Sequence, residues 1–267
     1  MDAEFFKFAK RDQKAERTES LENGRDIEAK LIFIRHQDPG KTPEGMSADY
    51  LTEKGQDAAR AQGKTIEGSN VGGYASPKQR AQETDDLILQ NVGEDVTVIN
   101  RKLAELQGHM GEKRSDNQKP DNQFRIKVRK ELDALLNFGK LKPKADAWAA
   151  EQKAAGDQRG DYDLIVDYYL NNPEMDKACG VLTPREAAAE IAERVATELG
   201  MTERFYKGSQ VEMVNVTHGP KLEPFLKEVI GFKSLAEIGG AVKPGEGFNF
   251  MIKTDDQRQR SALLSAC

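Results

Sequence analysis

The sequence predicts a three-layer α/β/α fold with a mainly parallel central sheet, because short apolar strands alternate with amphipathic helices. Residues 31–34 (Leu-Ile-Phe-Ile) form a continuous apolar run of the kind found in strands that are covered on both faces. Residues 211–217 form a second such strand. Alternating strands and helices need crossover connections, and these favour parallel strands with helices on both faces of the sheet.

The first half of the chain contains regular start and stop signals for these elements. Thr52 is a helix-capping residue, and Ser76 followed by Pro77 is typical of a second helix start. We therefore expect a helix over residues 53–68, a strand over 71–75, a helix from Pro77 to about 91, and a third strand over 96–99.

The strand pattern then stops, and residues 107–182 are predicted to form a helical cap inserted into the sheet domain. Its helices are expected over residues 122–138, 145–155 and 162–170. Thr183 and Glu186 have the spacing of a capping box with Pro184 at the first helical position, which predicts a long helix to Gly200. After the strand over 211–217, we expect a helix over 220–230 and an edge strand over 248–252.

These elements define the predicted domain organisation. A charged N-terminal extension covers residues 1–29, and its phenylalanines would either dock a helix or belong to a solvated tail. The α/β domain covers residues 30–252, and a C-terminal tail covers 253–267.

Composition excludes several classes of protein. The chain has 267 residues and a formal net charge of -5, whereas a general nucleic-acid-binding protein usually carries a basic excess. Two cysteines, Cys179 and Cys267, do not make a disulfide framework, so we expect a cytoplasmic protein. No apolar run approaches the roughly 20 residues that cross a bilayer, so we expect no membrane contact.

Two of the three histidines lie at the ends of predicted core strands, where open α/β sheets bind their ligands. His36 follows Arg35 at the first strand, and His218 follows the strand over 211–217. A third strand end leads into a helix whose first turn carries Arg80. Guanidinium groups match the oxygens of a phosphoryl group, and a neutral imidazole supplies a nucleophile, so the substrate is predicted to carry a phosphate.

Five sequence pieces carry a more specific resemblance. They are Leu-Ile-Phe-Ile-Arg35-His36, Leu51-Thr-Glu-Lys-Gly55, Ser76-Pro-Lys-Gln-Arg80-Ala-Gln-Glu-Thr84, Leu103-Ala-Glu105 and Val216-Thr-His218-Gly219. In this order and spacing, they resemble the histidine phosphatase superfamily, also called phosphoglycerate-mutase-like. The resemblance covers residues 30–106 and 183–252.

The resemblance implies a role for each matching residue. His36 would be the nucleophile that becomes a phosphohistidine, and the catalytic His218 would surround the phosphoryl oxygens together with Arg35 and Arg80. Apart from the resemblance, Thr217 or Gly219 could donate a backbone amide to the phosphoryl group, because the chain turns there from strand into helix. Glu105 would be the proton donor, with Glu112 or Asp116 as alternatives, and the reaction would need no metal and no cofactor. A hydrogen bond from the other ring nitrogen of His36 to a backbone carbonyl should fix its tautomer.

Departures from the family pattern leave alternatives open. The residue after the nucleophile is usually small, but here it is Gln37, which could crowd the phosphate or donate an amide hydrogen bond; Asp38 would repel a dianion if it faced the site. An inactive relative that binds a phosphorylated ligand or protein is therefore a second reading. Residues 37–50 lack the tryptophan and asparagine of the mutase branch, which favours hydrolysis over phosphate transfer.

The predicted cap offers weaker signals about the substrate. Residues 101–144 contain twelve Lys or Arg and six Asp or Glu, which either form a solvated face or steer an anion to the site. Trp148, Tyr168 and Tyr169 either line a specificity pocket or anchor the cap by packing. The predicted ligand is a phosphorylated small molecule or a phosphoprotein, and the sequence does not indicate an oligomeric state.

Overall fold

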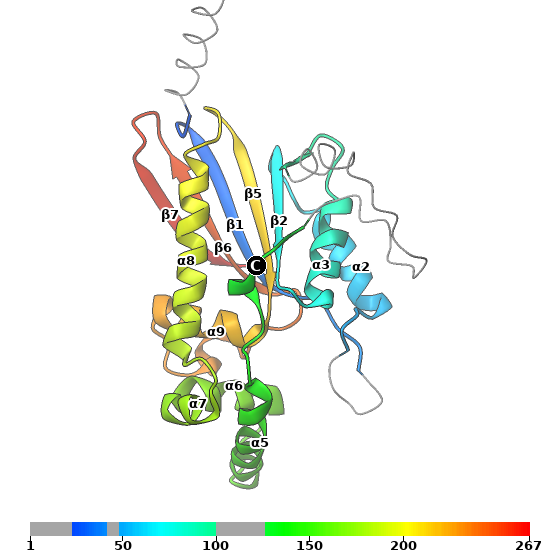
Figure 1. The fold of residues 1–267 in the computed structure, drawn as a ribbon, viewed down its shortest axis with the longest axis vertical. Helices are drawn as coiled ribbons and strands as arrows, with labels where there is room; N and C mark the ends of the chain where they lie inside the picture. The colour runs from blue at the N-terminus through cyan, green and yellow to red at the C-terminus, as the bar shows by residue number, and fades with distance from the viewer. Residues whose placement is uncertain (1–22, 42–47, 100–125) are drawn as a thin grey trace, which may run out of the picture.

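A computed structural model describes residues 23–41, 48–99 and 126–267. Its centre is one mixed sheet of seven strands in the order β3-β2-β5-β1-β6-β7, with β4 also paired to β2 (Figure 1). The strands are β1 (Ile27–Arg35), β2 (Asn70–Ala75), β3 (Thr97–Val98), β4 (Lys127–Val128), β5 (Gln210–Thr217), β6 (Gly247–Thr254) and β7 (Arg260–Ala266). Every pair among β1 to β5 is parallel, whereas β6 runs antiparallel to both β1 and β7.

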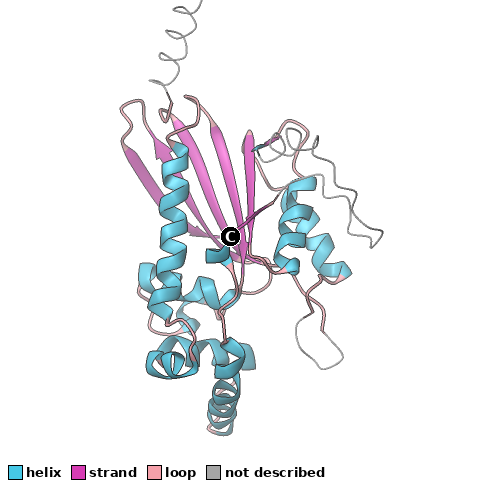
Figure 2. Ribbon diagram, in the orientation of Figure 1, coloured by secondary structure: helices cyan, strands magenta, loops and turns pink. Residues whose placement is uncertain are grey.

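Helices cover both faces of this sheet, which gives the expected three layers (Figure 2). One face packs against α2 (Glu53–Gly63) and α3 (Gln79–Gln90), in a core that includes Ile34 and Val214. The other face packs against α8 (Pro184–Thr202) and α9 (Gly219–Ile230). The predicted fold class is therefore confirmed, with β6 as the strand that departs from parallel pairing.

Three further helices lie beyond the carboxyl ends of the parallel strands (Figure 1). They are α5 (Phe138–Ala154), α6 (Asp161–Asn171) and α7 (Pro173–Cys179), and two 3-10 turns, η1 (Lys130–Leu132) and η2 (Leu235–Ile238), complete the described elements. The described part of the predicted cap thus includes a helical group at the edge of the sheet where the candidate site lies.

Local capping explains several confirmed helix starts. The Thr52 hydroxyl accepts a hydrogen bond from the Gly55 amide at 3.0 Å, and α2 begins at the next residue. Thr183 and Glu186 form both bonds of the predicted capping box at the start of α8. These side chains satisfy backbone amides that a first helical turn leaves without partners.

The prediction of a helix over residues 122–138 is wrong in its described part. Residues 127–128 form β4, which pairs with β2, and only the short turn η1 follows before α5. The Arg129 amide donates to the Ala75 carbonyl at 2.8 Å, which extends this pairing. The distant strand β2 decides the conformation here, because it offers hydrogen-bond partners that no local pattern reveals.

The ends of the predicted domain also need correction. β1 begins at Ile27, inside the predicted extension, and residues 260–266 of the predicted tail form the edge strand β7. A turn joins β6 to β7, in which the Asp255 carboxylate accepts hydrogen bonds from the amides of Gln257 and Gln259. This Asp-centred turn reverses the chain, and the predicted edge strand is therefore an interior strand.

No helix among the described residues is both long and apolar enough to span a membrane.

Candidate active site

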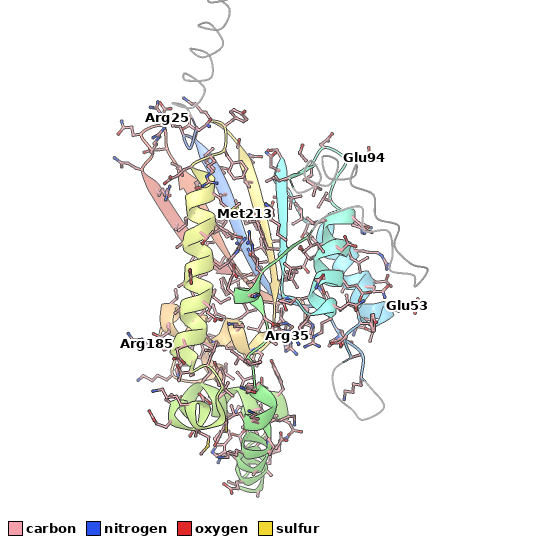
Figure 3. The ribbon with its side chains drawn as sticks, in the orientation of Figure 1. Arg25, Arg35, Glu53, Glu94, Arg185 and Met213 are labelled. Atoms are coloured by element: carbon pink, nitrogen blue, oxygen red, sulfur yellow. The ribbon has the colours of Figure 1, made fainter. Side chains whose placement is uncertain are left out.

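Three parallel strands bring the candidate residues together at one edge of the sheet. β5 lies between β2 and β1, so its end is flanked by the ends of both neighbours. The His36 amide donates to the Thr217 carbonyl at 2.9 Å, and the Ser76 amide donates to the Val216 carbonyl at 3.0 Å. These bonds fix His36 and Ser76 on either side of the chain segment that carries His218, and Figure 3 labels Arg35 at this edge.

The imidazole of His36 is held in the tautomer that a nucleophile needs. Its Nδ1 lies 2.8 Å from the carbonyl oxygen of Gln37, to which it donates a proton. Nε2 then carries the lone pair, and it accepts a hydrogen bond from Nε of Arg80 at 3.0 Å. The predicted hydrogen bond to a backbone carbonyl is therefore present, and it assigns nucleophilic character to Nε2.

His218 lies directly beside His36. The two ring centroids are 5.0 Å apart, and the ring planes meet at 65°. Nε2 of His218 is 2.8 Å from Oγ of Ser76, which also accepts a hydrogen bond from the Lys78 amide at 3.1 Å. The structure thus brings both predicted histidines into one site.

Ser76 has a different role from the helix cap that the sequence predicts. α3 begins at Gln79 after Lys78, so Ser76 lies outside the helix, where its hydroxyl contacts His218. A serine before a proline gives no signal that separates a helix cap from a partner of a distant histidine. The contact depends on the pairing of β2 with β5, which local sequence does not specify.

Burial keeps both imidazoles uncharged. Each is 4% exposed. Desolvation is the main reason why the pKa of His36 is lowered to about 3, and the positive charges of Arg80 and Arg35 contribute to this lowering. The pKa of His218 is also well below its usual value, mainly through burial and then through His36 and Arg80. At neutral pH, Nε2 of His36 is therefore unprotonated.

Two arginines surround the histidines and are incompletely neutralised. Arg80 lies 3.6 Å from the exposed carboxylate of Asp49. Arg35 donates from Nη1 to the Val242 carbonyl at 2.8 Å, and its Nε is buried without a hydrogen-bond partner. Within the described residues, no carboxylate lies within ion-pair distance of Arg35. Uncompensated guanidinium groups beside a neutral imidazole make a site for an anion.

Gln37 does not crowd the histidines. Its side-chain amide donates to Oε1 of Gln62 at 3.0 Å, and its backbone amide donates to the Thr84 hydroxyl at 3.1 Å. Asp38 is exposed and lies against Thr52 at the start of α2. The concern that either side chain opposes phosphate binding is therefore not supported by their contacts.

Tyr162 of α6 is a member of the site that the sequence analysis missed. Its ring lies under the guanidinium of Arg35, 4.5 Å from ring centroid to Cζ, and its buried hydroxyl fills the space that a side chain at Gly219 would take. Gly219 itself is the first residue of α9. No periodicity distinguishes Tyr162 from other aromatic residues of the helical insertion.

The aromatic residues that the sequence did single out serve as packing anchors. Tyr169 is fully buried and donates its hydroxyl proton to the Leu182 carbonyl at 3.1 Å. Trp148 packs against Tyr168 with ring centroids 5.6 Å apart. The packing alternative therefore holds for these three residues.

Several predicted residues lie outside the described part of the chain, namely Glu105, His109, Glu112 and Asp116. Among the residues that the structure does describe, no group of three His, Cys, Asp or Glu side chains is arranged to hold a metal ion.

The architecture matches that of known structures. It aligns with a phosphoglycerate mutase from Bacillus anthracis str. Sterne at a TM-score of 0.51 and 16% sequence identity, over 91% of this chain and 94% of that chain. The chain has a phosphoglycerate-mutase-like fold. This likeness agrees with the superfamily resemblance of the sequence motifs.

Two more distant structures also align along most of their length. The alignment with a mycobacterial hydrolase covers 88% of this chain and 96% of the hydrolase chain, at 13% identity and a TM-score of 0.48. The alignment with a mycobacterial glucosyl-3-phosphoglycerate phosphatase covers 89% of this chain and 96% of the phosphatase chain, at 12% identity and a TM-score of 0.46. No family model and no curated protein matches the sequence. At 16% identity, the likeness to the phosphoglycerate mutase establishes the fold alone.

Proposed function

We propose that the protein hydrolyses phosphomonoesters through a phosphohistidine formed on His36. The observation that carries this proposal is the geometry of the His36 ring. Nδ1 is committed to the Gln37 carbonyl, and Nε2 faces Arg80 as an uncharged acceptor. A neutral imidazole with a fixed tautomer, next to guanidinium groups, is equipped to attack a phosphorus atom whose oxygens those groups bind.

The proposed reaction has two steps at the same phosphorus atom. In the first, the Nε2 lone pair of His36 forms a bond to phosphorus, and the ester oxygen leaves with the electron pair of the broken bond. A carboxylic acid protonates this oxygen, a role that the sequence resemblance gives to Glu105. In the second, water attacks the phosphohistidine, the same carboxylate accepts its proton, and the bond electrons return to Nε2.

The surrounding residues bind and orient the transferred group. Arg80 already donates to Nε2 of His36, so its fork lies where phosphoryl oxygens would arrive. Arg35 presents a buried Nε that lacks a partner, and a phosphoryl oxygen would satisfy it. The ring of His218 lies 5.0 Å from that of His36 and would contact the same group. These donors stabilise charge that develops on the equatorial oxygens.

The substrate of this reaction is a phosphorylated small molecule or a phosphoprotein in our proposal. The phosphoglycerate mutase that shares the fold is named after a phosphorylated small molecule. Hydrolysis is favoured over transfer because residues 37–50 lack the mutase-type tryptophan and asparagine. The alternative of an inactive binding protein depended on crowding by Gln37, and the hydrogen bond of Gln37 to Gln62 argues against such crowding.

The test is phosphate release from 4-nitrophenyl phosphate in excess chelator. We expect turnover by the native chain, its loss in His36→Ala, and near-native turnover in His109→Ala, which removes the third histidine of the sequence. Binding of inorganic phosphate by the native chain without any turnover would instead support the inactive relative. Turnover that survives in His36→Ala would contradict the phosphohistidine.

A further inference from the structure

The outer edge of β2 is paired with two strands that are far apart in the sequence. β3 pairs with the first residues of β2, at Asn70 and Val71, and β4 pairs with its last residues, at Tyr74 and Ala75. Both pairings are parallel. The segment after β4 therefore leaves this edge beside the histidines.

The turn that follows β4 is fixed to both neighbouring strand ends. The Arg129 amide donates to the Ala75 carbonyl at 2.8 Å, immediately before Ser76. The Thr217 hydroxyl donates to the Leu132 carbonyl at 2.6 Å, immediately before His218. The Leu132 side chain is fully buried. These two hydrogen bonds and the buried side chain hold the next residue, Asp133, at the edge of the sheet beside Ser76 and His218.

The carboxylate of Asp133 meets the site through Ser76. The Ser76 hydroxyl lies 3.4 Å from Oδ1 of Asp133 and 2.8 Å from Nε2 of His218. The Ala134 amide also donates to Oδ1, at 2.7 Å. Both side-chain hydrogen bonds that Asp133 makes with described residues end on Oδ1. Asp133 is half-buried, which keeps it accessible to a substrate.

Charges near Asp133 place it close to the phosphate-binding groups. Its negative charge supports the protonated forms of Arg80 and of Lys221, and in both cases it opposes the lowering of the pKa by burial. The Asp133 carboxyl therefore lies near the groups that would bind the phosphate.

We infer that Asp133 is the proton donor to the leaving oxygen, the role that the sequence resemblance gives to Glu105. This inference rests on the proposed phosphohistidine reaction. As the phosphorus–oxygen ester bond breaks, Asp133 gives its proton to the leaving oxygen and becomes a carboxylate. In the second step, the carboxylate takes one proton from the attacking water, and the oxygen of that water joins phosphorus as the bond to Nε2 breaks.

Two neighbouring carboxylates fit this role less well. Glu131 is directed to the guanidinium of Arg194, 3.9 Å away, on the face of the sheet. Glu223 is fully buried, and its Oε1 accepts the Val242 amide proton at 3.0 Å. A fully buried side chain is not accessible to a substrate oxygen, whereas Asp133 is half-exposed.

The experiment compares two substrates that differ in their need for an acid. Phenyl phosphate releases a basic phenolate and needs protonation, whereas 2,4-dinitrophenyl phosphate releases a stable anion. We expect Asp133→Asn to lower kcat/KM for phenyl phosphate by about 100-fold or more, the usual contribution of a general acid. For the dinitrophenyl ester, kcat/KM should change much less, because this ratio includes no step after the ester bond breaks. Glu131→Gln, two residues earlier, is the matched control and should show no such selectivity.

The outcomes separate this inference from the proposed function. Equal loss on both substrates would overturn it, because a residue that only positions Ser76 would affect both esters alike. Selective loss in Glu105→Gln, with Asp133→Asn unaffected, would also overturn it and would leave phosphohistidine hydrolysis standing. A native chain that turns over neither ester would contradict the hydrolase and the inference together.

Discussion

Arg194 and Arg35 each lie over a tyrosine ring, and they differ in what else they contact. Arg194 lies over Tyr74 at 3.9 Å, donates from Nε to Asn215 at 3.0 Å, and pairs with the buried carboxylate of Glu198 at 2.5 Å. Arg35 lies over Tyr162 at 4.5 Å, bonds one backbone carbonyl, and has a buried Nε without a partner.

This difference distinguishes a structural arginine from one that is available to a ligand. The Arg194 network is almost fully buried on the face of the sheet, and its charge is compensated within the fold. Arg35 lies at the carboxyl edge of the sheet, where its charge is left for an incoming anion. The comparison therefore predicts that one arginine governs stability and the other governs activity.

The largest effect is expected for Arg35→Met. Loss of a guanidinium that stabilises the transferred phosphoryl group should lower kcat/KM by about 100- to 1,000-fold. The free energy of unfolding should change by less than about 1 kcal/mol, because Arg35 has no buried counter-ion among the described residues. Steady-state kinetics and urea unfolding check both. A variant that unfolds readily but keeps its turnover would reverse the roles of the two arginines.

The opposite pattern is expected for Arg194→Met. Breaking a buried ion pair leaves Glu198 uncompensated and should lower the free energy of unfolding by about 3 kcal/mol. Burial raises the pKa of Glu198 to about 7, so the loss should be smaller at pH 5, where this carboxyl is protonated. The measurement is urea unfolding at pH 5 and at a pH above 7. A stability loss below about 0.5 kcal/mol would show that the network is not structural in this sense.

Substitution of Tyr162 should have a smaller effect on activity, and this effect should depend on the aromatic ring and not on the hydroxyl. Tyr162→Ala removes a cation–aromatic contact worth about 1 kcal/mol and should raise KM about fivefold. Tyr162→Phe keeps the ring and is the matched control, so its KM should stay close to the native value. A loss of the same size in both variants would assign the effect to the hydroxyl instead of the ring.

The buried histidines predict an unusual pH response. Because the pKa of His36 is lowered to about 3, its ring protons should not shift in NMR spectra between pH 8 and pH 5. The unfolded chain binds protons to this histidine at about pH 6.5. Stability from His36 is therefore complete above pH 6.5 and is lost as the pH falls toward 3. A resonance that is absent in His36→Asn and titrates near pH 6.5 in the native chain would contradict this.

The smallest effect is expected for Gln37→Gly. The Gln37 side chain bonds to Gln62 and does not face His36, so its loss should leave kcat/KM within about twofold and cost about 1 kcal/mol of stability. A large gain in activity would mean that Gln37 obstructs the phosphate after all.

The central strands and the two histidines could be predicted because their signals are local. The apolar runs that end at Arg35 and Thr217 are long enough to specify buried strands, and a parallel sheet brings the residues after such strands together. The position of Gly219 at the start of a helix followed from the same reasoning.

The parts that were missed depend on long-range contacts. β4 has two residues and β7 has no β-branched residue, so their pairing with β2 and β6 is not visible in their own sequences. Tyr162 and Asp133 reach the site only because α6 lies beyond the sheet edge and η1 is tied to two strand ends. Their side chains have no motif that marks them as members of a site.

The most direct test of the account is a search for the covalent intermediate. Native protein and His36→Asn would be mixed with 32P-labelled substrate, quenched with alkali within milliseconds, and digested for mass spectrometry. We expect an alkali-stable, acid-labile phosphate on the peptide that contains His36, bonded through Nε2, and none in the variant. Turnover by the native chain without any label on this peptide, or label on a peptide that lacks His36, would contradict the proposed mechanism.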